Sequence, residues 1–405
     1  MADPLRVLLV GSRILPYRHN GDKNFWLDVL QRLPAKGVDA TVLSITIDDD
    51  VPGSDLPIRY LRPIPVYLEG GDTRFNADHR FLTGTNNYSS KTLSLGRILR
   101  KVRELCRELR PDVVHFVDNY GPATVVAREA LGSTRLAISA PTYDPNRFLY
   151  DTFLRMSFRS FDAIVPFSEA YGQRLCELGF EPRRIHVIRW GVDTDRFAPA
   201  TPEERASARR ALGVDEDTFL VIWTGFIQQT GERDLAFTLR TAEHALREDS
   251  GRITFAICFK GEHFRDEFRR YERAGLRVFR RPEEFRAARA AADLLHSSIV
   301  EPNSTAAPPL VWVESLALGI PISTTPVLGG QEAVVPGESG FAARTPEESA
   351  RQILELASDP GRLKRLREGA RRVAVERFSV DRSVDEHVEL WSRMAVGEFA
   401  PHRVG

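Results

Sequence analysis

Short apolar runs alternate with amphipathic segments along the first half of the chain. LRVLLVG (5–11) is apolar apart from Arg6, which is typical of a parallel strand buried on both faces, and a helical pattern follows from about Lys23 to Leu33. The alternation continues, with strands predicted at 39–45, 111–117, 135–140, 161–168 and 184–191 and helices near 94–109, 146–160 and 169–178. This pattern predicts an α/β domain in which helices cover both faces of an open parallel sheet.

The pattern then restarts in the second half. A new series of strands is predicted at 217–225, 252–261, 276–280, 292–299 and 320–325. The segment before it, 191–213, is rich in proline and charge and is expected to be a linker with an entry helix. We therefore expect two doubly wound, Rossmann-like domains, 1–190 and 191–405, whose last helix at about 376–396 can pack back on the first domain. Because such sheets bind ligands at the carboxyl ends of their strands, two facing domains would bind them in a cleft.

Composition narrows the class of protein. With 405 residues, 42% of them hydrophobic and 28% charged, the chain has the makeup of a soluble two-domain protein. Its 56 basic and 56 acidic residues balance, which argues against a nucleic-acid or anionic-membrane binder. The three widely spaced cysteines form no metal-ligand pattern, and no apolar segment reaches the length of a membrane span. We expect a cytoplasmic protein without a metal site.

The loop after the first strand offers a candidate phosphate contact. Asn20-Gly21 precedes the first helix, and backbone N–H groups at such a helix start can bind a phosphate or sugar. The alternative is an ordinary strand–helix turn. The chain has no GxGxxG or GxxxxGK[ST] sequence here, which argues against a dehydrogenase or a P-loop enzyme.

Longer stretches resemble a known family. SFDAIVPFSEAYGQRLCELGFEPRRIHVIRWGVDTDRFAP, DTFLVIWTG and PPLVWVESLALGIPISTTPVLGGQEAVVPGESGFAA are similar to segments of the GT-B glycosyltransferases of retaining family four. The resemblance implies a GT-B fold and transfer of a sugar from a nucleotide-diphosphate donor with retention, without a metal or other cofactor. It places the donor on the second domain and the acceptor, a small molecule or a glycan, on the first.

The resemblance also implies donor contacts. Glu314 matches the second glutamate of the family's E-x7-E motif, which binds the donor ribose, and the N–H groups near Leu310 and Val311 match those that meet the phosphates. A carboxylate can accept from two ribose hydroxyls, and a helix N-terminus attracts a diphosphate. The alternative for Glu314 is a residue that only caps a helix start.

Several charged positions of the family are replaced. Ala306 stands where the first glutamate belongs, and Phe226 and Thr230 stand in the loop that normally carries a basic pair. The family's histidine is absent near Pro141. A leaving diphosphate without a positive partner would be costly, since electrostatic stabilisation is commonly the largest catalytic contribution.

Other residues can substitute at the donor site. Lys260 follows a buried strand and is either a surface residue or a partner of the phosphates. The loop after the strand at 217–225 keeps both family glycines, Gly225 and Gly231, and adds two uncharged candidates, Gln228 and Gln229. Two hydroxyl side chains near Ala306, Ser304 and Thr305, are further candidates. On the acceptor side, Asp118 follows a strand, and Tyr143 and Asp144 lie beside the lost histidine; these three are the catalytic candidates. His115, within its strand, is expected to be a core residue.

Three hypotheses about the function follow from the sequence. The first is an active hexosyltransferase with an adapted donor site, acting in specialised-metabolite or polysaccharide biosynthesis. The second is a GT-B pseudoenzyme that binds a nucleotide sugar or a partner chain without turnover. The third is a relative with other chemistry, a sugar-nucleotide epimerase or a pseudo-glycosyl coupling enzyme, for which Asp118 and Asp144 would be the acid/base groups.

Overall fold

The computed structural model describes residues 3–12, 14, 21–45, 55–61, 94–117, 122–140, 150–225, 232–259, 272, 275–279, 281–300 and 307–398. The chain divides into two compact units, one formed by Met1–Gly191 with Val380–Gly405 and the other by Val192–Ser379. Each unit is built on a six-stranded sheet whose strands all pair in parallel, which confirms the predicted α/β class.

The sheet of the first unit has the order β3-β2-β1-β4-β5-β6. Its strands are β1 (Leu5–Ser12), β2 (Val38–Ile45), β3 (Ile58–Leu61), β4 (Val113–Phe116), β5 (Arg135–Ala140) and β6 (Ala163–Pro166). The helices are α1 (Gly21–Arg32), η1 (Leu33–Lys36), α4 (Leu95–Leu109), α5 (Pro122–Val125), α6 (Ala127–Leu131), α7 (Tyr150–Phe158), α8 (Glu169–Glu177), η2 (Pro182–Arg184) and the last helix, α16 (Val380–Ala395). α16 packs against α1, β1 and β4, so the C-terminal end of the described chain belongs to the core of this unit.

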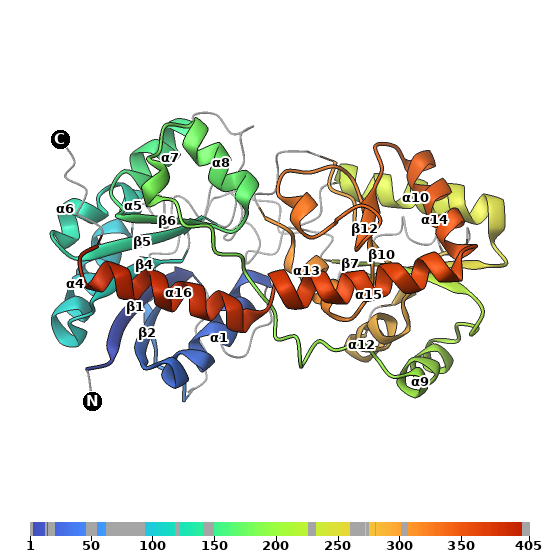
Figure 1. Ribbon diagram of the computed structural model, residues 1–405, viewed down its shortest axis with the longest axis horizontal. Coiled ribbons are helices and arrows are strands. Elements are labelled where there is room, and N and C mark those ends of the chain that lie inside the picture. Colours follow the sequence, from blue (N-terminus) through green and yellow to red (C-terminus); the bar gives the residue numbers. More distant parts are fainter. Residues whose placement is uncertain are drawn as a thin grey trace, which may run out of the picture. The chain divides into compact units, whose positions relative to one another are not determined.

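The sheet of the second unit has the order β12-β11-β10-β7-β8-β9. Its strands are β7 (Phe219–Gly225), β8 (Ile253–Phe259), β9 (Arg277–Phe279), β10 (Leu294–His296), β11 (Ile322–Thr324) and β12 (Gly340–Ala342). Its helices are α9 (Pro202–Leu212), α10 (Glu232–Asp249), α12 (Pro282–Ala291), α13 (Leu310–Ala317), η3 (Gly330–Glu332), α14 (Pro346–Ala357) and α15 (Pro360–Arg377). α10 packs with α14, and α12 packs with α9, on opposite faces of this sheet (Figure 1).

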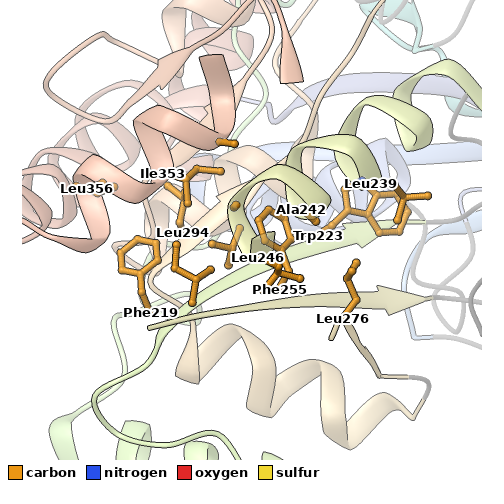
Figure 2. Close-up of a cluster of buried hydrophobic side chains, with 14 of the residues drawn as sticks. Phe219, Trp223, Leu239, Ala242, Leu246, Phe255, Leu276, Leu294, Ile353 and Leu356 are labelled. Atoms are coloured by element: carbon orange, nitrogen blue, oxygen red, sulfur yellow. The ribbon is translucent and has the colours of Figure 1, made fainter. Parts of the chain in front are cut away.

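The core of the second unit forms where strand and helix periodicities meet. Phe219, Val221 and Trp223 alternate along β7 and project from one face, and α10 presents Leu235, Leu239, Ala242 and Leu246 to them. Figure 2 shows Phe219, Trp223, Leu239, Ala242 and Leu246 together with Phe255 and Leu294 from the sheet and Ile353 and Leu356 from α14. Burial of a large apolar side chain stabilises a fold by about 1.5–3 kcal/mol, so this layer fixes the sheet against its helices.

Three aspartates, each just before a strand, make the same kind of hydrogen bond to a neighbouring strand. The carboxylates of Asp112, Asp162 and Asp293 accept hydrogen bonds of 2.8–2.9 Å from backbone N–H groups at the start of a neighbouring strand, those of Arg6, Leu136 and Leu220 respectively. Arginines pair with all three: Arg6 lies 3.9 Å from Asp112, Arg128 pairs with Asp162, and Arg205 and Arg209 pair with Asp293. Buried carboxylates need such partners, so these clusters fix the amino ends of the sheets.

The segment between the two series contains the predicted entry helix. Thr201 and Glu204 form a capping box at the start of α9, and Gly213 ends the helix in a left-handed conformation with φ 62°. The strand predicted at 184–191 is wrong. This segment follows β6 through hydrogen bonds from the N–H groups of His186 and Ile188, but it forms only an isolated bridge at Ile185, because the chain passes into the linker before a ladder can extend.

Candidate functional site

Both sheets reverse their strand order beside their first strand. The reversal lies between β1 and β4 in the first unit and between β7 and β10 in the second. Loops that leave two such strands turn to opposite faces of the sheet, and ligands of doubly wound folds bind at the carboxyl ends of these strands. The residues that follow β1, β4, β7 and β10 are therefore the places to look for a site.

In the first unit, the ends of β1 and β4 approach closely. A Cβ atom on Gly11 would clash with Cδ1 of Ile14 and lie 2.7 Å from Cγ2 of Val117, so a larger residue there would force these side chains to shift. α1 begins at Gly21 itself, two residues before the predicted start near Lys23. The other candidates of this unit, Asn20, Asp118, Tyr143 and Asp144, lie outside the described residues.

In the second unit, Gly225 ends β7 and pairs with Phe259, the last residue of β8. Lys260 follows Phe259 directly in the sequence. Lys260 itself lies outside the described residues, as do Gln228, Gln229, Gly231, Ser304 and Thr305.

The chain that leaves β10 is held to α10 and to the end of β11. Asp234 in the first turn of α10 accepts a hydrogen bond of 2.6 Å from Val300 N–H, and its backbone carbonyl accepts one of 2.8 Å from Ser298 Oγ. Ile299 N–H donates to Thr325 Oγ1 over 2.9 Å. These contacts hold the chain just before residues 301–306, the segment in which the sequence resemblance places Ala306 at the position of the family's first glutamate.

α13 begins at Leu310 without a side-chain cap. Pro309 occupies the N-cap position and makes no side-chain hydrogen bond to the helix, while its carbonyl accepts from the N–H of Trp312 over 2.9 Å. Val311 is the second residue of the helix. An uncapped helix start has N–H groups available for an anion, in the region where the resemblance places the diphosphate.

Glu314 lies in the second turn of α13, so it is not an N-cap residue and that alternative is wrong. Its Oε2 lies 2.9 Å from Nη2 of Arg289, which belongs to α12. Both side chains are largely buried, with 17% of Glu314 and 20% of Arg289 exposed. Glu314 is therefore a partly accessible carboxylate in an ion pair with a neighbouring guanidinium, although the Nη2 group is not aligned for a hydrogen bond.

Arg289 was not among the candidate residues predicted from the sequence. Its guanidinium carbon lies 5.0 Å from the centre of the Phe197 ring, in addition to the ion pair with Glu314. The sequence around it, EEFRAARAA, has arginines at helical spacing that are typical of a solvated helix face. Only the contacts of Arg289 with Glu314 and the Phe197 ring separate it from the exposed Arg286.

Two histidines occupy matching places in the two sheets. His115 in β4 contacts Ser139 Oγ over 2.9 Å, and His296 in β10 contacts Ser323 Oγ over 3.1 Å. Both are fully buried. Burial lowers the pKa of His296 to about 3, and burial together with nearby His387 lowers the pKa of His115 well below its usual value. They are neutral core side chains rather than catalytic acids, which confirms the expectation for His115.

Other kinds of site find no support in the described part of the chain. There, no group of three His, Cys, Asp or Glu side chains could hold a metal ion. No helix among the described residues combines the length and the apolar character needed to span a membrane.

Family comparisons cover both halves of the chain. Residues 19–196 match the model described as Glycosyltransferase Family 4, and residues 218–359 match the model described as Glycosyl transferases group 1. Among curated proteins, the D-inositol 3-phosphate glycosyltransferase of Streptomyces bingchenggensis is 30% identical over 239 residues, which are 54% of this chain and 50% of that protein. The enzyme of the same name from Geodermatophilus obscurus is 32% identical over 237 residues, 54% and 49% of the two chains. The matched region spans about half the length of these relatives.

Solved structures show the fold. HepE from Anabaena in complex with UDP has a TM-score of 0.70 at 18% identity, covering 96% of this chain and 100% of that one. Sucrose-phosphate synthase from Thermosynechococcus elongatus has a TM-score of 0.72 at 16% identity, covering 97% and 100%. These likenesses confirm the GT-B fold that the sequence resemblance implied.

Proposed function

Because this chain belongs to the GT-B glycosyltransferases, we propose that it transfers a hexosyl group from a nucleotide-diphosphate sugar to a small-molecule or glycan acceptor, with retention at the anomeric carbon. The observation that carries the proposal is the start of α13. An uncapped helix N-terminus at Leu310 precedes by one turn a partly exposed carboxylate, Glu314, in the connection that follows the switch-point strand β10. One end of the helix suits a diphosphate, and the carboxylate suits ribose hydroxyls.

The donor and acceptor classes rest on neighbours and are part of the proposal. HepE was solved with UDP and UDP-glucose, which makes UDP-sugars the first donors to test. The relatives named D-inositol 3-phosphate glycosyltransferase suggest a polyol phosphate as the first small acceptor to test. We propose a role in specialised-metabolite or polysaccharide biosynthesis, with no metal required.

Lys260 is our candidate for the positive charge that the replaced basic pair no longer supplies. The residue before it, Phe259, ends β8 beside Gly225 of β7, at the carboxyl edge of the sheet. A cation at this edge would stabilise the negative charge that develops on the leaving diphosphate. Lys260→Ala is therefore expected to lower the rate of transfer.

Calorimetry and turnover with UDP-, GDP-, ADP- and TDP-sugars test the proposal. We expect one donor class to bind, to be hydrolysed slowly alone and to be consumed faster with an acceptor, and Glu314→Ala to weaken its binding by about tenfold or more, the loss expected when a charge-assisted hydrogen bond is removed. Binding without turnover for any acceptor would point to a pseudoenzyme. Failure of every donor to bind, or a Glu314→Ala variant that binds like the wild type, would refute the donor site.

A further inference from the structure

A chain of contacts connects the linker to the middle of α13. Phe197 lies in the linker segment DTDRFAP, Arg289 on α12 and Glu314 on α13. We propose that Arg289 is a positioning residue that holds the Glu314 carboxylate for the ribose of the bound nucleotide. This inference rests on the proposed function and adds to it a residue that determines affinity for the ribose hydroxyls.

The guanidinium of Arg289 is held between an aromatic ring and a carboxylate. Its Cζ lies 5.0 Å from the centre of the Phe197 ring, and its Nη2 lies 2.9 Å from Glu314 Oε2. A cation over an aromatic face is attracted by the ring, and a largely desolvated ion pair is screened less than one in water. Arg289 thus has two restraints on its position before any ligand arrives.

The backbone that carries the Phe197 ring is fixed as well. Nη1 of Arg371 on α15 donates hydrogen bonds of 2.8–2.9 Å to the carbonyl oxygens of Thr194, Phe197 and Ala317. Ala317 is the last residue of α13. The linker is therefore tied to α13 twice, through Arg371 at the end of the helix and through Arg289 at Glu314.

The ion pair leaves the carboxylate able to bind. Only one of its oxygens, Oε2, has a contact to Arg289, and within the described residues this is the only polar contact of the Glu314 side chain. A carboxylate has about four lone-pair sites, so both oxygens can still accept from ribose hydroxyls. Without Arg289 no described group would fix the orientation of Glu314, and ordering it would oppose nucleotide binding.

The test compares UDP with 2′,3′-dideoxy-UDP, which lacks both ribose hydroxyls, by calorimetry on the full chain. Arg289→Gln should weaken binding of UDP by about three- to tenfold, the effect of ordering one long side chain on binding, and leave binding of the dideoxy compound unchanged. Arg289→Lys, which keeps the charge, should recover part of the loss. Arg286→Gln, at an exposed position of the same helix, is the matched control and should behave like the wild type.

A double variant separates positioning from a general structural role. In a Glu314→Gln background, Arg289→Gln should cause no further loss of UDP affinity, because its effect acts through the carboxylate. Equal weakening of UDP and dideoxy-UDP by Arg289→Gln, no weakening of either, or tighter binding of UDP would overturn the inference while leaving the proposed function intact. Failure of the wild type to bind any of UDP, GDP, ADP and TDP would instead refute the proposed function.

Discussion

Acid should loosen the first unit through His387, a residue of α16. His387 is fully buried, its ring packs against Trp26, His115 and Trp391, and its Nδ1–H donates to the Ser383 carbonyl over 2.7 Å. Its Nε2 is buried without a hydrogen-bond partner among the described residues. A proton added there would place an unpaired charge in the core.

The size of the effect follows from the pKa. Burial lowers the pKa of His387 from 6.5 to about 4, although the bond to Ser383 acts in the opposite direction. A group whose pKa is lower in the folded state contributes stability that is present above the unfolded pKa and is lost as the pH falls towards the folded pKa. Between pH 7.5 and 5.5 the loss from His387 is about 1.4 kcal/mol, and it approaches about 3 kcal/mol at pH 4.

Urea unfolding at pH 7.5, 6.5 and 5.5, followed by tryptophan fluorescence, measures this loss. His115, His186 and His296 have lowered pKa values as well, so the contribution of His387 is the difference between the wild type and His387→Phe. The variant keeps an aromatic ring beside Trp26 and Trp391 and should lose about 1.4 kcal/mol less between pH 7.5 and 5.5. Identical pH slopes for the two proteins would refute the argument.

Further predictions concern a buried aspartate of the second unit and two glycines in different helices. Asp293→Asn removes the carboxylate that Arg205, Arg209 and Arg367 share and leaves the buried Arg209 uncompensated. Urea unfolding should therefore show that the free energy of unfolding falls by about 3–5 kcal/mol. A fall of less than about 1 kcal/mol would contradict this prediction. Gly369→Ala should destabilise the fold by at least about 1 kcal/mol, because the Cβ would run into the Glu338 carbonyl oxygen. Gly96→Ala changes an exposed helix position with nothing near the added Cβ, and it should instead stabilise the fold by about 0.5–1 kcal/mol. A higher melting temperature for Gly369→Ala than for Gly96→Ala would contradict both predictions.

The sequence predicted the elements that have strong periodicity. The apolar run LRVLLVG corresponds to β1. Segments with apolar residues at three- and four-residue spacing correspond to helices such as α4. Two short edge strands, β3 and β12, were missed, because three or four residues with mixed burial have no clear period. The overpredicted strand at 184–191 has the apolar alternation of a strand but forms only a bridge beside β6.

The site shows the same division. Glu314 and the start of α13 could be named as candidates because the motif around them is local in sequence. Arg289 was not, because its contacts are with a carboxylate on another helix, Glu314, and with a ring 92 positions earlier in the chain, at Phe197. Contacts between distant segments leave no trace in the pattern of a single helix.

A crystal structure of the protein with UDP tests the central claim most directly. We expect diphosphate oxygens within hydrogen-bond distance of the N–H groups of Leu310 and Val311, and ribose hydroxyls on the carboxylate of Glu314 while Arg289 still contacts it. A diphosphate bound away from the start of α13, or a ribose that does not touch Glu314, would contradict it.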